Sequence, residues 1–193
     1  MKLRGMDYRV VDDYFPEWVV SQVSEYFEGF PVSYSNSSKL TYAEGSRFFG
    51  NMLMTNDAWT IPPELQSWFI PYLTGSIVND ICKDKATNVH RVLVNGQVKG
   101  QHGVQHRDCD SREDNMLSVI YHAHGSSGDT VVGVDRIPFK EGRLVIFDSY
   151  EEHRGEAPEE GYRVSLGMMF SYQDEFHVPG NCLLYTSPSP RDS

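Results

Sequence analysis

A histidine, an aspartate and a second histidine in the second half of the chain have the types and spacing of a metal site. His106 and Asp108 are separated by a single residue, so an extended backbone would point both side chains to one face. His153 follows further along, just after a strongly apolar segment that is predicted to be a strand. Two histidines and one carboxylate can form a facial triad, which holds iron and leaves positions open for other ligands and oxygen.

Arg163 stands at the start of another predicted strand, residues 162–172. On that strand Arg163, Ser165 and Gly167 would lie on one face, and the residues between them are apolar and would lie on the other. A guanidinium suits bidentate capture of a carboxylate, and a charge on the inward face of a strand is costly without a partner. We therefore predict a pocket for a dicarboxylate, with Arg163 and Ser165 in its wall.

The elements that must position these residues are predicted to be helices early in the chain and mostly strands later. Apolar residues recur at helical spacing between Pro16 and Gly29, which predicts a first helix. A second helix is predicted from Pro62 to near Gly75, kinked or shortened by Pro71. Helices first and short strands later indicate helices that buttress one face of a β-sandwich or small barrel.

The strands are predicted mostly in the second half of the chain. Residues 47–54 are expected to be extended, and the pattern predicts strands at 87–95, 116–123, 130–134, 143–147 and 162–172. Asn95-Gly96 is a strong turn signal, and we expect a turn there.

The chain from about Asn88 to Tyr172 resembles the iron(II)- and 2-oxoglutarate-dependent dioxygenases, specifically the prolyl-hydroxylase-like branch that is common in phage and microbial genomes. The matching stretches are 90–97, 100–108, 128–130, 142–147 and 153–165, in the family's order. The resemblance implies a mostly β fold with an α buttress: a double-stranded β-helix (jelly-roll or cupin-like barrel) with N-terminal helices packed on one sheet. It also implies Fe(II), with 2-oxoglutarate and O2 as co-substrates and ascorbate as a reductant.

The same resemblance assigns roles to particular residues. It implies His106, Asp108 and His153 as iron ligands and Arg163 as the partner of the distal carboxylate of 2-oxoglutarate. His102 lies on the same segment as His106 but has no acidic residue two positions later, so it ranks below His106 as a ligand.

Further candidates follow from the family pattern. They are Ser165, Thr130, Tyr121 and His122 for the co-substrate, and Asn95 and Arg91 for the substrate. Tyr121 and His122 would face opposite sides of a regular strand, so at most one of them lines the pocket.

The activity implied is hydroxylation of an unactivated C–H bond, with release of succinate and CO2. A prolyl or other residue of a protein or peptide is the expected substrate, and a free amino acid or small metabolite is an alternative. A non-catalytic jelly-roll or cupin-like binding module is the alternative from another class. An iron halogenase would need a small residue in place of Asp108, which argues against that chemistry.

Composition limits the partners. Lys and Arg total 17 and Asp and Glu total 27, so the net charge of −10 argues against nucleic acid and anionic membranes as partners. No apolar run approaches the ~18 residues that a spanning helix requires, and no apolar stretch follows the basic N-terminal residues as in a secretory signal. The three cysteines are too few and scattered for a disulfide framework. We expect a soluble cytoplasmic protein, and the sequence does not determine its oligomeric state.

The domain prediction is a single catalytic domain over residues 1–181. Residues 1–85 are expected to form a helical support and 86–175 the β-helix core, with 34–49 and 96–105 covering the site. Residues 182–193 resemble the conceptual translation of a sequencing adapter, and we interpret them as a non-native tail.

Overall fold

The computed structural model describes residues 8–37, 47–81, 86–111 and 115–172. The β-strands are β1 (Tyr8–Val11), β2 (Ser33–Ser37), β3 (Arg47–Thr55), β4 (Ala58–Trp59), β5 (Ala86–Val98), β6 (Met116–His124), β7 (Thr130–Val132), β8 (Asp135–Ile137), β9 (Leu144–Asp148), β10 (His153–Gly155) and β11 (Tyr162–Tyr172). The helices are α1 (Glu17–Glu28) and α2 (Phe69–Ser76), with a 3-10 turn at Pro63–Leu65 and a π-helical turn at Ile77–Ile81.

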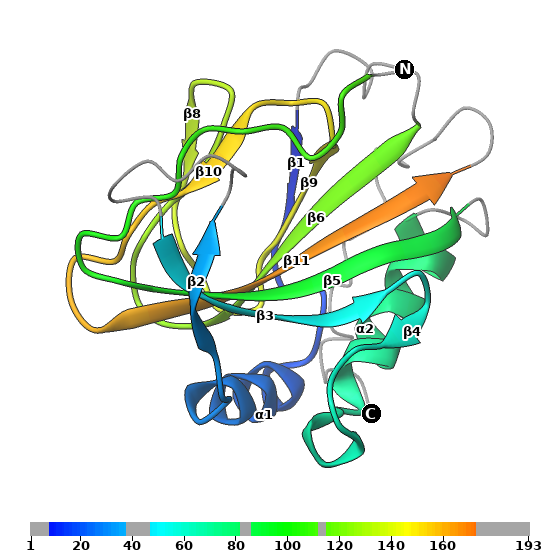
Figure 1. Ribbon diagram of the computed structural model, residues 1–193, viewed down its shortest axis with the longest axis horizontal. Coiled ribbons are helices and arrows are strands. Elements are labelled where there is room, and N and C mark those ends of the chain that lie inside the picture. The colour runs from blue at the N-terminus through cyan, green and yellow to red at the C-terminus, as the bar shows by residue number, and fades with distance from the viewer. Residues whose placement is uncertain (1–7, 38–46, 82–85, 112–114, 173–193) are drawn as a thin grey trace, which may run out of the picture.

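The strands form two antiparallel sheets. The large sheet has the order β1-β9-β6-β11-β5-β3-β2, with β4 paired to β3, and the small sheet has the order β10-β7-β8. An isolated bridge between His106 and His153 adds one more segment beside β10. Helices α1 and α2 lie on one side of the large sheet, and the small sheet lies on the other (Figure 1). This arrangement is a double-stranded β-helix with a helical buttress, so the predicted fold class is confirmed.

Strand β11 shows why the two sides of the large sheet differ. Its even-numbered residues from 164 to 170 are apolar and at most 3% exposed, and they belong to the main hydrophobic cluster with residues of α1 and α2. Its odd-numbered residues Arg163, Ser165 and Gly167 line a cavity between the sheets. Burial of each large apolar side chain contributes about 1.5–3 kcal/mol, so the alternation strongly favours this register over a one-residue slip.

The first predicted helix is confirmed, and the second differs in detail. Helix α1 begins after Pro16, as expected. Pro71 causes no break because α2 begins at Phe69, which places the proline in the first turn, where a backbone N–H has no intrahelical partner to lose. The preceding Pro63–Leu65 segment forms its own 3-10 turn.

The expected turn at Asn95-Gly96 is wrong, because β5 continues through both residues. Asn95 pairs with Ser165 of β11 on one side and with Gly50 of β3 on the other. A Cβ added to Gly96 would lie 3.3 Å from the Cβ of Phe49, so the glycine permits close packing between strands.

The helical support expected over residues 1–85 is incomplete, because this part of the chain also contributes strands. Strand β1 pairs with β9, and β3 pairs with β5, so both extend the large sheet. These pairings join segments far apart in sequence, which the local pattern alone does not reveal. Residues 182–193 and 38–46 lie outside the described residues.

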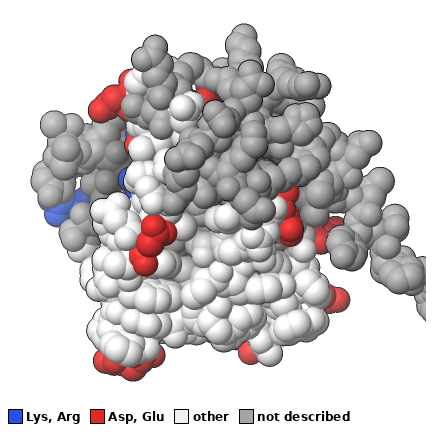
Figure 2. Space-filling view, turned by 90° about the vertical axis from the view of Figure 1, so that its right-hand side faces the viewer, with Lys and Arg blue, Asp and Glu red and all other residues white. Residues whose placement is uncertain are grey.

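On the face shown in Figure 2, more acidic than basic side chains are visible among the residues that are not grey. On the face that Figure 2 shows, acidic side chains are spread out between uncharged residues and do not gather in one patch. Among the helices of the described segments, none has the length and apolar character needed to cross a membrane.

Candidate functional site

The predicted metal ligands come together at one end of the cavity. Asp108 Oδ1 lies 3.8 Å from Nε2 of His106, and Asp108 Oδ2 lies 3.5 Å from Nε2 of His153. One ligand atom from each of the three residues lies within 4.8 Å of the other two. Two imidazole nitrogens and one carboxylate oxygen at this spacing are a donor set that suits Fe(II).

Backbone contacts orient both imidazole rings. His106 Nδ1 lies 2.9 Å from the carbonyl oxygen of Val104, and His153 Nδ1 lies 3.0 Å from that of Glu151. In the neutral rings these contacts place the proton on Nδ1, which donates to the carbonyl and leaves the Nε2 lone pair free for a metal. The two backbones are tied as well, since the His106 and His153 amides each donate to the other residue's carbonyl.

Neighbouring donors keep Asp108 ionised. Burial by itself raises the pKa of its carboxyl group, but the positive charge of Arg91, that of His153 when it is protonated, and the Ser118 hydroxyl favour the charged form and bring that pKa below its ordinary value. Ser118 Oγ donates to Asp108 Oδ2 at 2.6 Å, and Arg91 forms an ion pair with Oδ1. The site therefore presents a carboxylate, the form that binds a metal.

Burial also acts on His153, which is 5% exposed. It lowers the pKa of the imidazole to about 4, although the nearby Asp108 carboxylate opposes this change. His153 is therefore neutral near pH 7, as a metal ligand must be.

Arg163 lies in the wall of the same cavity, and its side chain is only 1% exposed. Its Nη1 donates to the carbonyl oxygens of Asp129 at 3.1 Å and Glu156 at 3.0 Å, and its Nη2 donates to Thr130 Oγ1 at 3.5 Å. Its Nε has no hydrogen-bond partner among the residues that the structure describes. A buried, unsatisfied N–H of a guanidinium is costly, so this end of the cavity is suited to an anionic ligand.

Thr130 adds a second donor beside Arg163. The amide N–H of Lys140 donates to His122 Nδ1 at 3.3 Å, so Nε2 of the neutral ring carries the proton and donates to Thr130 Oγ1 at 2.9 Å. The Thr130 hydroxyl accepts these contacts, and its own hydrogen remains for a ligand in the cavity. Arg163 and Thr130 together form a donor pair that fits a carboxylate.

One cavity of about 170 Å³ joins the two ends. Its other lining residues include the apolar side chains of Phe48, Leu93 and Ile120. Arginines outnumber carboxylates along it: of the described lining residues, Arg91, Arg107, Arg154 and Arg163 are cationic and Asp108 alone is acidic. Arg91, Arg107 and Arg154 each pair with a carboxylate, of Asp108, Glu152 and Glu156 respectively. Arg163 is therefore the described lining arginine whose charge is left for an anionic ligand.

The structure separates Tyr121 from His122. Strand β6 points Ser118, Ile120 and His122 toward the cavity side, whereas Tyr121 packs against Phe15 and Phe69 on the helix side. The expectation that Tyr121 could contact the co-substrate is therefore wrong for this geometry, because alternation along the strand directs it into the helical core. His122 reaches the cavity through Thr130.

Four other residues named in the sequence analysis line the cavity, and one of them makes a contact that was not expected. Ser165, Thr130, Asn95 and Arg91 all line the cavity. Arg91, expected near the substrate, is engaged with the candidate ligand Asp108. His102 is exposed and its Nδ1 accepts a hydrogen bond from the Ala157 amide at 3.3 Å, away from the triad.

Some residues of the site were not predicted. Ser118 supports Asp108, and Gln97 reaches the carbonyls of Gln101 at 2.7 Å and Gly155 at 3.1 Å beside Arg163. The alternation of β6 could have identified Ser118, since it shares a face with His122 four residues later. Gln97 and Gly103 belong to the segment 96–105, which was expected to cover the site, and both line the cavity.

Comparison with solved structures shows the same fold. An oxidoreductase of the 2OG-Fe(II) oxygenase family from Burkholderia pseudomallei is 15% identical over 89% of this chain and 88% of its own, with a TM-score of 0.64. A prolyl hydroxylase from Trichoplax adhaerens, solved with a hypoxia inducible factor peptide fragment, is 14% identical over 88% of this chain and 86% of its own, with a TM-score of 0.64. A viral collagen prolyl hydroxylase from Paramecium Bursaria Chlorella virus-1, solved with 2OG, is 15% identical over 90% of this chain and all of its own, with a TM-score of 0.56.

Comparisons by sequence add nothing to these. No family model and no curated protein matches the chain. At such low identity the solved structures establish the fold, and the chemistry has to be argued from the residues of the cavity.

Proposed function

We propose that this chain is an Fe(II)- and 2-oxoglutarate-dependent oxygenase that hydroxylates an unactivated C–H bond. One observation carries the proposal: a single cavity holds a His-Asp-His donor set and, in its wall, a buried arginine whose Nε has no partner among the described residues. A non-catalytic binding module would need either group for its ligand, but has no chemical need for both.

Each group has a distinct part in this proposal. His106, Asp108 and His153 would hold Fe(II), which when bound with 2-oxoglutarate supplies the oxygen-activating chemistry. The overall reaction consumes the substrate R–H, 2-oxoglutarate and O2, and yields R–OH, succinate and CO2. One oxygen atom enters the product, and the other enters succinate.

The residues of the chain orient the co-substrate. Arg163 and Thr130 would bind its distal carboxylate, so that the 2-oxo acid end faces the metal ligands. The carbonyl contacts of the two imidazoles hold the Nε2 atoms in place before any ligand arrives. Leu93, Ile120 and Phe48 make part of the lining apolar, which limits water around the reacting groups.

A prolyl or other residue of a protein or peptide is the proposed substrate. Two of the three solved structures named above are prolyl hydroxylases, and one of them holds a peptide, which supports this choice. A free amino acid or a small metabolite is the second candidate, because the solved structures with this fold also include a carbocyclase from nogalamycin biosynthesis.

Succinate release tests the proposal. The purified chain is supplied with Fe(II), 2-oxoglutarate, O2 and ascorbate, and succinate is measured with proline-containing peptides, free proline and other amino acids. We expect slow succinate formation without substrate and stimulation by a prolyl peptide. Turnover without stimulation by any prolyl peptide would contradict the prolyl substrate, and no turnover with iron bound would contradict the oxygenase.

A further inference from the structure

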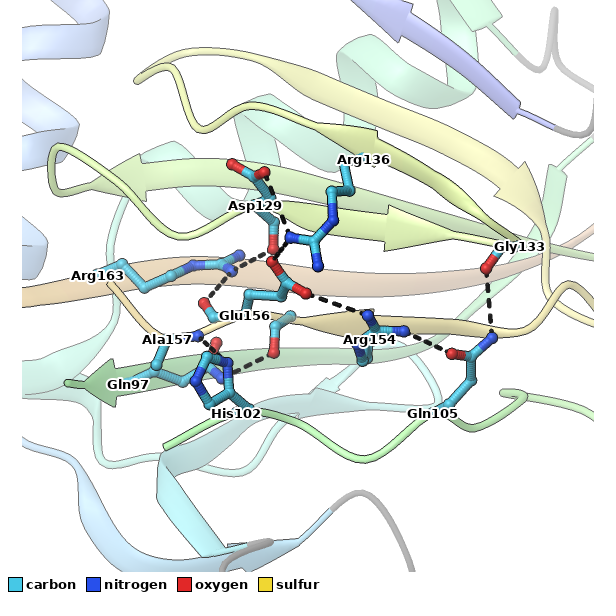
Figure 3. A network of polar contacts seen from close by, with 11 residues as sticks. Gln97, His102, Gln105, Asp129, Gly133, Arg136, Arg154, Glu156, Ala157 and Arg163 are labelled. Atoms are coloured by element: carbon cyan, nitrogen blue, oxygen red, sulfur yellow. Dashed lines mark hydrogen bonds and ion pairs between the residues drawn. The ribbon is translucent and has the colours of Figure 1, made fainter. Parts of the chain in front are cut away.

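A network of ion pairs and hydrogen bonds crosses the small sheet beside Arg163, at the end of the cavity where we propose that a carboxylate binds (Figure 3). The Glu156 carboxylate accepts a hydrogen bond from Arg154 Nη2 at 3.1 Å through one oxygen, and its other oxygen pairs with Arg136 Nη1. Arg154 extends this network, because its Nη1 donates a hydrogen bond to Gln105 Oε1 at 2.6 Å. Gln105 precedes His106 and Arg154 follows His153 in the sequence, and both histidines are predicted metal ligands. The network therefore links the two ends of the cavity.

Arg163 and Arg136 both contact Asp129 and Glu156, Arg163 from the cavity and Arg136 from the surface. Arg163, inside, uses the backbone carbonyls of Asp129 and Glu156 as acceptors for Nη1. Arg136, outside on β8, contacts the side chains of the same two residues, with Nη1 paired to Glu156 and 3.9 Å from Asp129 Oδ2. The amide of Glu156 also donates to the Asp129 carbonyl at 2.8 Å, which ties the two backbones together.

This arrangement determines how the Arg163 guanidinium is oriented. A planar guanidinium whose Nη1 is held by two carbonyl oxygens has little freedom to rotate, so Nε stays in a fixed direction. Gly155 leaves room for it, since a Cβ there would lie 3.1 Å from Arg163 Nη1 and 2.7 Å from Gln97 Oε1. Any shift of residues 129 and 156 would therefore misalign the donors offered to a carboxylate.

The acidic pair also compensates for the burial of Arg163. Burial lowers the pKa of this guanidinium to about 10, and the Asp129 and Glu156 charges oppose the change. The Arg163 guanidinium is therefore cationic near pH 7. Its neighbours can then affect ligand binding through its orientation, because its charge does not change.

We propose that Arg136 is a positioning residue for binding of the co-substrate: its ion pairs with Glu156 and Asp129 fix the two carbonyls that orient Arg163. The proposal rests on the proposed function, which identifies the bound carboxylate as that of 2-oxoglutarate. Arg136 itself does not line the cavity, and its side chain is 59% exposed, so a surface ion pair of little consequence is the competing explanation.

Calorimetric titration of 2-oxoglutarate into the Mn(II)-loaded protein, without O2, separates the two explanations. Lys140→Ala is the matched control, because it removes another exposed cation whose ion pairs, with Asp12 and Asp13, lie away from Arg163. It keeps the backbone amide of residue 140, which is the only part of Lys140 that contacts His122 among the described contacts. We expect Arg136→Ala to raise the Kd for 2-oxoglutarate about three- to tenfold, whereas Lys140→Ala leaves it unchanged. Arg136→Lys, which keeps the cation, should restore part of the affinity.

Two further measurements exclude a general loss of structure. The affinity for Mn(II) and the Tm of the ligand-free protein should be the same in Arg136→Ala and Lys140→Ala. In steady-state assays KM for 2-oxoglutarate should rise in Arg136→Ala, while kcat at saturating co-substrate stays at the wild-type value.

The outcomes distinguish this inference from the proposed function. If the wild-type chain binds 2-oxoglutarate and Arg136→Ala binds it within about twofold of wild type, the positioning role is wrong and the proposed function stands. A parallel loss of Mn(II) affinity in Arg136→Ala also overturns the positioning role. If the wild-type chain binds no 2-oxoglutarate, the proposed function fails and the inference fails with it.

Discussion

The two ends of the cavity differ in how far their polar groups are already satisfied. One is the proposed metal end, with His106, Asp108 and His153, and the other is the proposed carboxylate end, with Arg163. At the metal end, His106 and His153 each use Nδ1 on a backbone carbonyl, and Asp108 accepts from Ser118 and Arg91. At the carboxylate end, Arg163 is buried with its Nε unpaired among the described residues.

The difference reflects what each ligand requires. A metal needs lone pairs, which neighbouring groups can orient without blocking them, so the metal end is satisfied before binding. A carboxylate needs hydrogen-bond donors, and a donor kept free inside a protein costs about 1–3 kcal/mol until the ligand arrives. We therefore expect the metal end to tolerate an empty state better than the carboxylate end does.

The largest expected effect comes from breaking the metal end alone. His106→Ala removes one of three ligands and should lower the affinity for Mn(II) by at least about 100-fold, measured by electron paramagnetic resonance of the free ion. His102→Ala is the control on the same segment and should bind Mn(II) like wild type. Equal loss in both variants, or retention in His106→Ala, would show that the ligand set is misassigned.

Breaking the carboxylate end alone should have the next largest effect. Arg163→Met should raise the Kd for 2-oxoglutarate by about 100-fold, because a buried charge partner is lost, and should leave Mn(II) binding intact. Thermal melts provide a second measurement: 2-oxoglutarate at about 100 times its Kd should stabilise the Mn(II)-loaded wild type by about 2.7 kcal/mol. The same concentration should stabilise Arg163→Met by only about 0.4 kcal/mol, because it then no more than equals the raised Kd. If Mn(II) binding fell as well, the two ends would not be independent.

A smaller effect concerns pH and the residue that supports Thr130. Burial, together with Arg163 and Arg143, lowers the pKa of His122 well below 6.5, so the unfolded chain binds the proton more readily than the folded one. Stability should be full above pH 6.5 and should fall as the pH drops below it, by at most about 1.4 kcal/mol per pH unit from this group.

His122→Gln isolates that contribution. Its free energy of unfolding, from urea titrations between pH 7 and pH 5, should fall less steeply than that of wild type, with the remainder due to groups that both proteins share. A slope equal to that of wild type would mean that the pKa of His122 is the same in the folded and the unfolded chain, so that burial does not lower it.

The smallest expected effect tests the other face of β6. Tyr121 is buried among aromatic residues on the helix side, and its hydroxyl has no hydrogen-bond partner in the described part of the chain. Tyr121→Phe should leave the Kd for 2-oxoglutarate unchanged and stabilise the protein by between zero and about 1 kcal/mol. Weaker binding of 2-oxoglutarate in this variant would place Tyr121 in the site after all.

Some of the site could be predicted because it depends on local patterns. The spacing of His106 and Asp108 and the alternation of residues 162–172 are patterns within one segment. The structure brings the first pair together through an isolated bridge and a bend, and it forms a strand over the second. The turn predicted at Asn95-Gly96 was wrong for the same reason. A local turn preference takes no account of β3 and β11, which pair with Asn95 from its two sides. Tertiary pairing outweighs local preference in the middle of a sheet.

The sequence by itself determined which chemical groups are available to this protein: two imidazoles and a carboxylate that suit a metal, and an arginine that suits an acid. Only the tertiary structure decided which groups meet. It turned Tyr121 toward the helices and His122 toward Thr130, brought Arg91 to Asp108, and set Arg136 behind Arg163. The physical reason is that period and spacing specify the face of a strand, whereas the partner across that face depends on strand order and on which side the helices cover.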